Sequence, residues 1–171
     1  NASLYEQASI RSNELETLFR SAQATAVTLD LDEVARRVTV QLLSALRTDA
    51  CTVFIWDDVN SRLEVRGEIS ARPEGTVGEQ PGDVFSLDDY TLRERALRER
   101  SLLVVRSEDE LPDGEAALMK RHGAAARMLI PLVVNEISIG LVEVESDDPQ
   151  RYFGGDDKRL GRTLASQAAI S

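Results

Sequence analysis

The sequence predicts an α+β fold, with a β-hairpin at its centre and helices before and after it. Residues 127–134 form a nearly unbroken run rich in Val, Ile and Leu, and the pair Asn135-Glu136 is a two-residue break of the hairpin type. Apolar residues then alternate with small or polar ones over residues 137–144 and change phase midway. Strands this apolar on two faces are typical of the middle of a sheet covered on both sides.

Length and composition indicate one globular domain with room for an added helix. The chain has 171 residues, of which 42% are hydrophobic and 29% charged. No apolar stretch approaches the roughly 20 residues of a membrane span, and no secretory signal is visible. Because the sequence starts and stops in the middle of a pattern, we expect a segment of a larger protein.

The charge and the rare residues exclude several classes of function. A net charge of −10 argues against a nucleic-acid partner, which needs a concentrated positive surface. One cysteine excludes an internal disulfide, and one histidine excludes most His-rich metal sites. We therefore expect a reducing, cytoplasmic setting and predict no metal ligands, and the sequence does not identify a cofactor.

The first 25 residues predict a separate N-terminal helix, ahead of a domain that spans residues 26–171. Its apolar seam has alternating spacings of four and three residues, with one basic interruption: Leu4, Ala8, Arg11, Leu15, Leu18 and Ala22. Two interpretations stay open. The helix either packs on its own sheet or forms a coiled-coil contact in a homodimer.

The next elements are a second helix and a first strand. Asp30 and Glu33 form a capping box that starts a helix running to about Arg47. Residues 50–56 predict a strand that is apolar on both faces, followed by a hairpin loop at residues 57–61 and a returning strand.

A long irregular segment separates the two halves of the chain. Residues 70–85 carry three glycines and two prolines without periodicity, which is typical of a binding lid or a disordered loop. A helix beginning at Leu87, a strand at residues 102–105 and a helix at residues 113–122 follow, and a last helix begins at Asp157.

Several segments resemble the GAF domain family of small regulatory modules. Residues 129–132 and 139–143 resemble the central hairpin of that family, residues 152–170 its closing helix, and residues 49–57 its first strand. The resemblance implies a GAF-like (profilin-like) antiparallel sheet of five or six strands with helices on both faces. The N-terminal, second and C-terminal helices would cover one face, and the long loop with the two short helices the other.

The resemblance also implies a function. We expect a regulatory sensor domain of a larger signalling protein, which binds a small molecule or relays a signal through its terminal helices to an output domain. The alternative is a ligandless dimerisation and helix-relay module. A third reading, an enzyme of the sulfoxide-reductase type, conflicts with the presence of a single cysteine.

Few residues are candidates for chemistry, and we predict no catalytic group. Cys51 is expected to be a buried inert thiol, and His122 a helix-capping or surface residue. Glu143 and Glu145 are interpreted as the solvated end of a strand. The charged run at residues 93–100 is interpreted as a solvated helix face, from which one arginine could turn toward an anionic ligand.

A ligand site is predicted between the first strand and the helix that follows the long loop. It combines apolar side chains with a few polar ones, as small-molecule sites do: Thr52, Phe54, Trp56, Phe85, Tyr90, Arg93 and Leu97. The alternative is that Phe85, Tyr90 and Leu97 fill this space as ordinary core.

Overall fold

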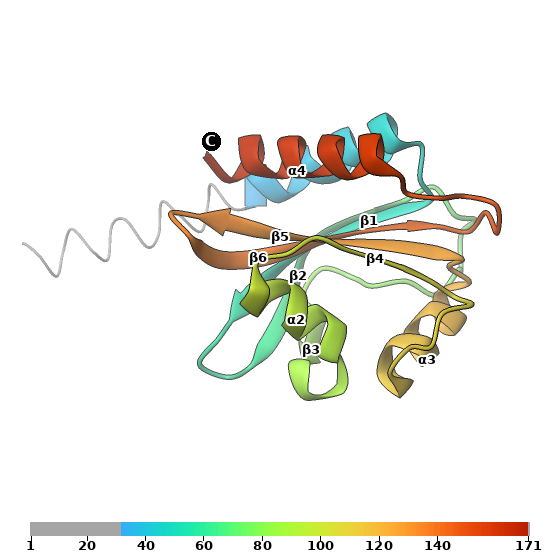
Figure 1. Ribbon diagram of the computed structural model, residues 1–171, viewed down its shortest axis with the longest axis horizontal. Coiled ribbons are helices and arrows are strands. Elements are labelled where there is room, and N and C mark those ends of the chain that lie inside the picture. Colours follow the sequence, from blue (N-terminus) through green and yellow to red (C-terminus); the bar gives the residue numbers. More distant parts are fainter. Residues whose placement is uncertain (1–31, 171) are drawn as a thin grey trace, which may run out of the picture. The chain divides into compact units, whose positions relative to one another are not determined.

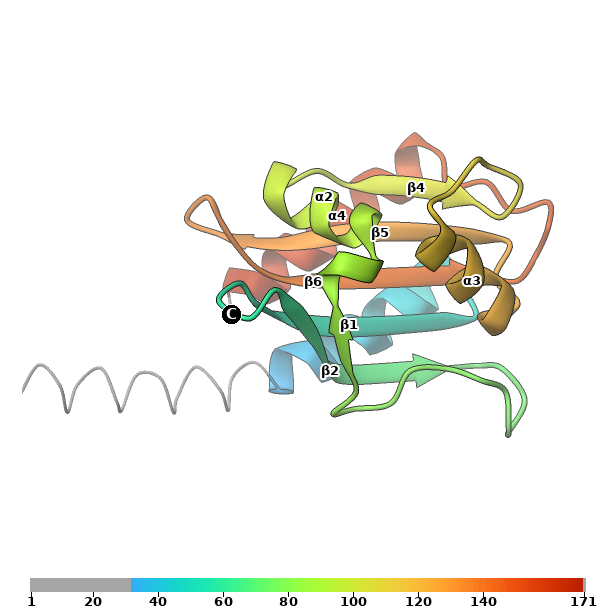
Figure 2. The same cartoon turned by 90° about the horizontal axis from the view of Figure 1, so that it is seen from below.

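The computed structural model describes residues 32–170, so the predicted helix of residues 1–25 lies outside the described residues. After a helix at residues 32–46, six strands form one sheet: β1 (Ala50–Asp57), β2 (Arg62–Ser70), β3 (Val84–Ser86), β4 (Leu103–Arg106), β5 (Ala126–Val134) and β6 (Ile137–Ser146). Every neighbouring pair is antiparallel, and the order across the sheet is β3-β2-β1-β6-β5-β4 (Figure 2). The predicted α+β class and antiparallel sheet are confirmed.

Helices lie on both faces of this sheet (Figure 1). The helix at residues 32–46 and α4 (Gly155–Ile170) cover one face, which we call the terminal-helix face. The opposite face, the α2 face, carries the 3₁₀ turn η1 (Leu87–Asp89), α2 (Thr91–Glu99) and α3 (Asp113–His122). We predicted that the second and C-terminal helices would cover one face and the two short helices the other, and the structure confirms this. Within residues 32–170 every helix is too short or too polar to traverse a bilayer.

The central hairpin forms where the sequence predicts it. Asn135 and Glu136 have φ angles of 49° and 65°, so both adopt the left-handed conformation that a type I′ turn requires, although neither is glycine. The change of phase in the second strand also has a structural cause. The β5–β6 register shifts so that Ile139 is left without an opposite residue, and this bulge moves the following side chains to the other face.

The two faces of the sheet bury separate hydrophobic clusters, and β1 contributes to both. Cys51 and Val53 pack on the terminal-helix face, whereas Phe54 packs on the α2 face. The prediction that this strand is apolar on both sides is therefore confirmed. One strand was missed: β3 pairs with β2 at the end of the long loop, which leaves residues 71–83 irregular. At three residues it is too short to show a periodicity in the sequence.

Gly140 provides a test of how tightly the central strands pack. A Cβ atom added there would lie 2.2 Å from the carbonyl oxygen of Phe54 on β1. We expect Gly140→Ala to lower the free energy of unfolding by about 1–3 kcal/mol, because the β1–β6 ladder must shift to admit the methyl group. Urea denaturation measures the change. The matched control is Gly154→Ala, since a Cβ atom at Gly154 meets nothing within 4 Å. Equal stability of the two variants would contradict the close approach.

Candidate functional site

A fully buried arginine lies at the centre of the α2 face. Arg93 projects from α2 with no exposed surface and is bound by two carboxylates. Its Nε donates to Glu143 on β6 over 2.6 Å, and its Nη2 donates to Glu143 over 3.1 Å and to Glu79 over 2.6 Å. Glu79 belongs to the irregular loop at residues 71–83. One side chain thus joins a helix, a central strand and a loop.

Three aromatic rings surround the same guanidinium group. Its Cζ atom lies 4.6 Å from the ring centroid of Phe54, 4.9 Å from that of Phe85 and 4.7 Å from that of Tyr90. The rings also contact each other edge to face, with centroids 6.1 Å apart for Phe54 and Phe85 and 5.8 Å apart for Phe85 and Tyr90. Ring faces attract a cation most strongly where water is excluded, so these rings add to the attraction of the two carboxylates.

A second buried arginine shares one of these carboxylates. Arg127 on β5 donates from Nε over 3.1 Å and from Nη2 over 2.9 Å to Oε1 of Glu143. Burial alone would raise the pKa of Glu143, but the charges of Arg127 and Arg93 outweigh it and hold this pKa below its usual range. Glu143 is therefore an ionised bridge between two arginines.

The pKa of Glu79, the carboxyl group from the loop, is shifted in the opposite direction. Burial raises the pKa of Glu79, and the nearby charge of Arg93, which Glu79 shares with Glu143, offsets this only in part. Of the two carboxylates that bind Arg93, Glu79 is thus the weaker acid and binds a proton more readily.

Glu115 fixes the start of α2 from a neighbouring helix. Its Oε1 accepts the backbone N–H groups of Leu92 over 2.9 Å and of Arg93 over 3.2 Å, which are otherwise without partners in the first turn of α2. Gly114 permits this approach, since a Cβ atom there would lie 1.9 Å from the carbonyl oxygen of Asp89. Burial raises the pKa of Glu115 despite the opposing charge of Arg127. Glu79, Arg93, Glu115, Arg127 and Glu143 form what we call the Arg93 cluster.

A second polar group continues along the same face. Glu145 on β6 lies 3.0 Å from Nδ1 of His122 and 3.2 Å from Nη1 of Arg72, and Arg72 also donates to Asp147 over 2.7 Å. Burial would raise the pKa of Glu145, but the hydrogen bond and charge of His122, with the arginine charges, bring it below its usual range.

Three buried atoms of the Arg93 cluster have no hydrogen-bond partner within the described protein. They are Nη1 of Arg93, Nη1 of Arg127 and Oε2 of Glu115. Burying a polar atom unpaired is costly, so such atoms mark places where a further polar group would be favoured.

The structure brings most of the predicted site residues together. Phe54, Phe85, Tyr90 and Arg93 touch, and Leu97 belongs to the same buried cluster. Thr52 is buried on β1, with Glu143 as its cross-strand neighbour. Trp56, near the end of β1, is half-buried and packs against the same cluster, and the guanidinium of Arg98 lies 5.6 Å from its ring centroid.

Several sequence interpretations were wrong. Glu143 and Glu145 are not a solvated strand end but are buried. His122 lies in the last turn of α3, as expected, but it is buried against Glu145 and is not at the surface. The helix face at residues 93–100 carries two of the expected exposed pairs, yet Arg93 points inward. An overlooked signal was Arg127 inside an apolar strand, opposite a strand that carries two glutamates on one face.

Cys51 is buried as predicted. It has no exposed surface, lies on the terminal-helix face, and burial raises the pKa of its thiol. The described residues contain no group of three or more His, Cys, Asp or Glu side chains that could hold a metal ion.

The family profile described as GAF domain matches residues 30–171. The blue-light-absorbing form of the PixJ GAF domain of Thermosynechococcus elongatus is similar, with a TM-score of 0.70, 17% identity and 84% of each chain covered. A GAF domain/HD domain protein of Geobacter sulfurreducens gives a TM-score of 0.69 and 20% identity, with 82% of this chain and 90% of that chain covered.

The GAF domain of an Acinetobacter phosphoenolpyruvate-protein phosphotransferase gives a TM-score of 0.62 and 18% identity, with 91% of this chain and 90% of that chain covered. The phycocyanobilin-bound GAF domain of a cyanobacterial phytochrome gives a TM-score of 0.70 and 15% identity, with 90% of each chain covered. No curated protein matches the sequence.

The Arg93 cluster predicts a large difference between two arginines of one helix. We expect Arg93→Met to lower the free energy of unfolding by about 3–5 kcal/mol, because Glu79 stays buried without its partner and Glu143 keeps only Arg127. The matched control, Arg95→Met, removes an exposed arginine from α2 and should change stability by less than about 1 kcal/mol. Urea denaturation at neutral pH compares them. Similar stabilities of the two variants would show that the buried ion pairs are not needed.

Proposed function

We propose, since the chain belongs to the GAF domain family, that it is the sensor domain of a larger signalling protein. In this proposal a small molecule binds on the α2 face, and the terminal helices carry the response to an output domain. GAF domains are regulatory modules. The candidate functions for this one differ in whether it receives its signal from a bound small molecule.

One observation carries the proposal: Arg93 binds the loop, the sheet and the aromatic rings at once. Its partners Glu79, Phe54, Phe85 and Glu143 come from the irregular loop, β1, β3 and β6. Any molecule that alters the surroundings of this guanidinium group must shift the loop, α2 or both. Such a linked set of contacts supports a device in which binding changes the arrangement of elements.

The proposed ligand site is the one predicted from the sequence: Thr52, Phe54, Trp56, Phe85, Tyr90, Arg93 and Leu97. Its centre is filled by the protein's own side chains, so a ligand must enter by moving the loop at residues 71–83. Glu79 is the loop residue that binds Arg93, and the raised pKa of its carboxyl group weakens its ionised state. The unpaired Nη1 atoms of Arg93 and Arg127 would favour a ligand with a hydrogen-bond acceptor.

The single thiol does not fit two other activities. A phytochrome GAF domain similar to this chain is phycocyanobilin-bound. In this chain Cys51 lies on the terminal-helix face with no exposed surface, on the side of the sheet away from the Arg93 cluster. Covalent attachment of a bilin in the proposed site is therefore not part of the proposal, nor is a cysteine-based reductase.

A second candidate function is a ligandless relay module. The observation in its favour is the completeness with which Arg93 and its three rings occupy the α2 face. In either case we propose a homodimer in the cytoplasm. Its contact would run through the terminal helices, including the seam from Leu4 to Ala22 that lies outside the described residues.

A fragment screen by protein-observed NMR, with native mass spectrometry of the purified protein for bound molecules and dimers, separates the two candidates. We expect fragments to shift the resonances of Phe54, Phe85 and Tyr90. They should bind more tightly to Glu79→Gln, because the loop is then held to Arg93 by a weaker contact. The matched control is Glu74→Gln, an exposed residue of the same loop, which should bind fragments like the unaltered protein. If all fragments bind elsewhere and Glu79→Gln changes nothing, the ligandless relay is the better account.

A further inference from the structure

The outer edge of β5 is open along part of its length. β4 pairs with β5 only from Ala126 to Leu129, so among the described residues no strand covers the edge from Ile130 onward. The chain at residues 100–102, which leads from α2 into β4, lies beside this opening instead, since Arg100 and Leu102 line one pocket together with Ile130. The result is a notch in the sheet edge, between α4 on one face and the end of α2 on the other.

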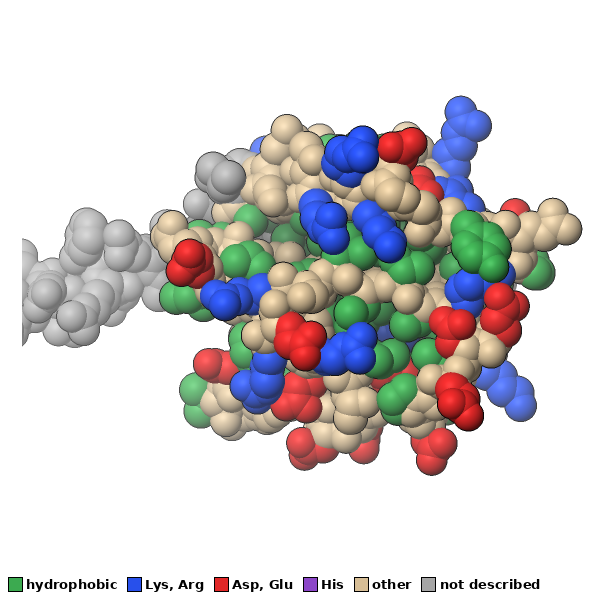
Figure 3. Space-filling model, viewed as in Figure 1, with side chains coloured by type: hydrophobic (Ala, Val, Ile, Leu, Met, Phe, Trp, Pro, Cys, Tyr) green, Lys and Arg blue, Asp and Glu red, His purple; other side chains and the backbone are tan. Residues whose placement is uncertain are grey.

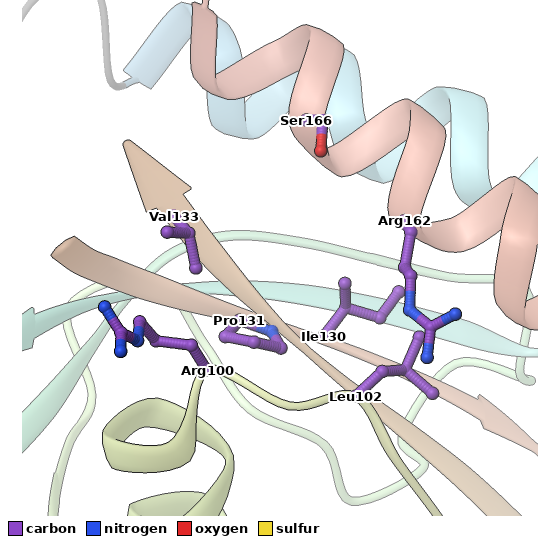
Figure 4. A pocket seen from close by; sticks show the side chains of 7 residues that line it. All are labelled: Arg100, Leu102, Ile130, Pro131, Val133, Arg162 and Ser166. Atoms are coloured by element: carbon purple, nitrogen blue, oxygen red, sulfur yellow. The ribbon is translucent and has the colours of Figure 1, made fainter. Parts of the chain in front are cut away.

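The notch has an apolar floor and a basic rim. Its volume is about 170 Å³, and Figure 4 shows the side chains that line it: Arg100, Leu102, Ile130, Pro131, Val133, Arg162 and Ser166. Arg162 and Ser166 of α4 point toward the floor from above, and Arg100 lies at the other side. Figure 3 shows Lys and Arg side chains over α4 with hydrophobic side chains below them, at the sheet edge.

Both arginines are exposed and keep donors free, and Arg100 is also held by a hydrogen bond. Arg100 ends α2 in the left-handed conformation with φ of 52°, and its Nη1 donates over 2.6 Å to the carbonyl oxygen of Glu136. The side chain of Arg162 makes no hydrogen bond or ion pair within residues 32–170. It follows Gly161, where α4 approaches β5 so closely that a Cβ atom would lie 2.9 Å from Cδ1 of Ile130.

We propose that the notch binds a small organic carboxylate with a compact apolar body. An apolar floor with an arginine on each side matches such a ligand, because a carboxylate accepts charge-assisted hydrogen bonds from an arginine while its body displaces water from the floor. This preference for an anion is a property of the notch and not of the whole chain, which carries a net charge of −10.

Size and backbone chemistry narrow the ligand further. A volume of 170 Å³ resembles that of a protein cavity of about 150 Å³ that admits one benzene ring. It is too small for a nucleotide or a tetrapyrrole, since sites for molecules of drug size are roughly 300–1,000 Å³. A peptide strand is disfavoured at this edge, because Pro131 has no amide hydrogen to donate to an added strand.

A ligand in the notch would lie between α2 and α4, two helices that a ligand at the α2-face site would not connect. It would lie beside Arg162 on α4 and near the end of α2, where Arg100 lines the other side of the notch. Because α4 is the closing helix of the domain, the notch is a second input that acts on this helix directly. The proposal stands independently of a ligand at the Arg93 cluster.

Benzoate is the probe, titrated into the protein and followed by two-dimensional NMR. We expect saturable shifts at Leu102, Val133 and Ser166, with binding at least about tenfold weaker for the neutral analogue benzamide. Ser166→Phe, which places a ring over the floor, should abolish binding whatever the charge of the probe.

Two arginines of α4 provide the matched comparison. Arg162→Gln should weaken benzoate binding at least about fivefold, since one charge-assisted contact is lost. Arg159→Gln should leave it unchanged, because Arg159 is exposed and pairs with Asp156 over 3.2 Å. The proposal is overturned if benzoate does not saturate, if benzamide binds equally well, or if the two variants bind alike.

Discussion

The α2 face of this domain depends on one constraint: a buried arginine cannot lose its proton and must be given counter-charges. An arginine stays charged at any pH at which a protein folds, and moving that charge out of water is expensive. The fold meets the cost of burying Arg93 with Glu143 from the sheet, Glu79 from the loop and three ring faces. Most of the unusual features of this face follow from that need.

The same constraint explains how irregular segments acquire fixed positions. The loop at residues 71–83 has no periodicity, yet Glu79 is buried in it because it supplies one of the charges that Arg93 requires. The carboxylate of Glu115 accepts hydrogen bonds from the backbone N–H groups in the first turn of α2. It thereby ties α3 to the helix that carries Arg93. Buried ion pairs are a poor source of net stability, so their effect here is to select one arrangement of loop and helices.

The sequence was sufficient for the features that local patterns encode. The two-residue break at Asn135, the two apolar faces of β1 and the change of phase in β6 all correspond to observed structure. Periodicity could not identify the counter-charges, because Glu79 and Glu143 lie 14 and 50 residues from Arg93 in the chain. A glutamate in an apolar strand looks the same whether it ends in water or faces an arginine from another element.

The central claim is that Arg93 and Glu79 act as a coupled pair that holds the loop on the sheet. A double-mutant cycle of Arg93→Met and Glu79→Gln, measured by urea denaturation, tests it most directly. The account predicts a coupling free energy of at least about 1.5 kcal/mol, as found for close charge pairs away from water. Additive effects of the two substitutions, within about 0.5 kcal/mol, would contradict it.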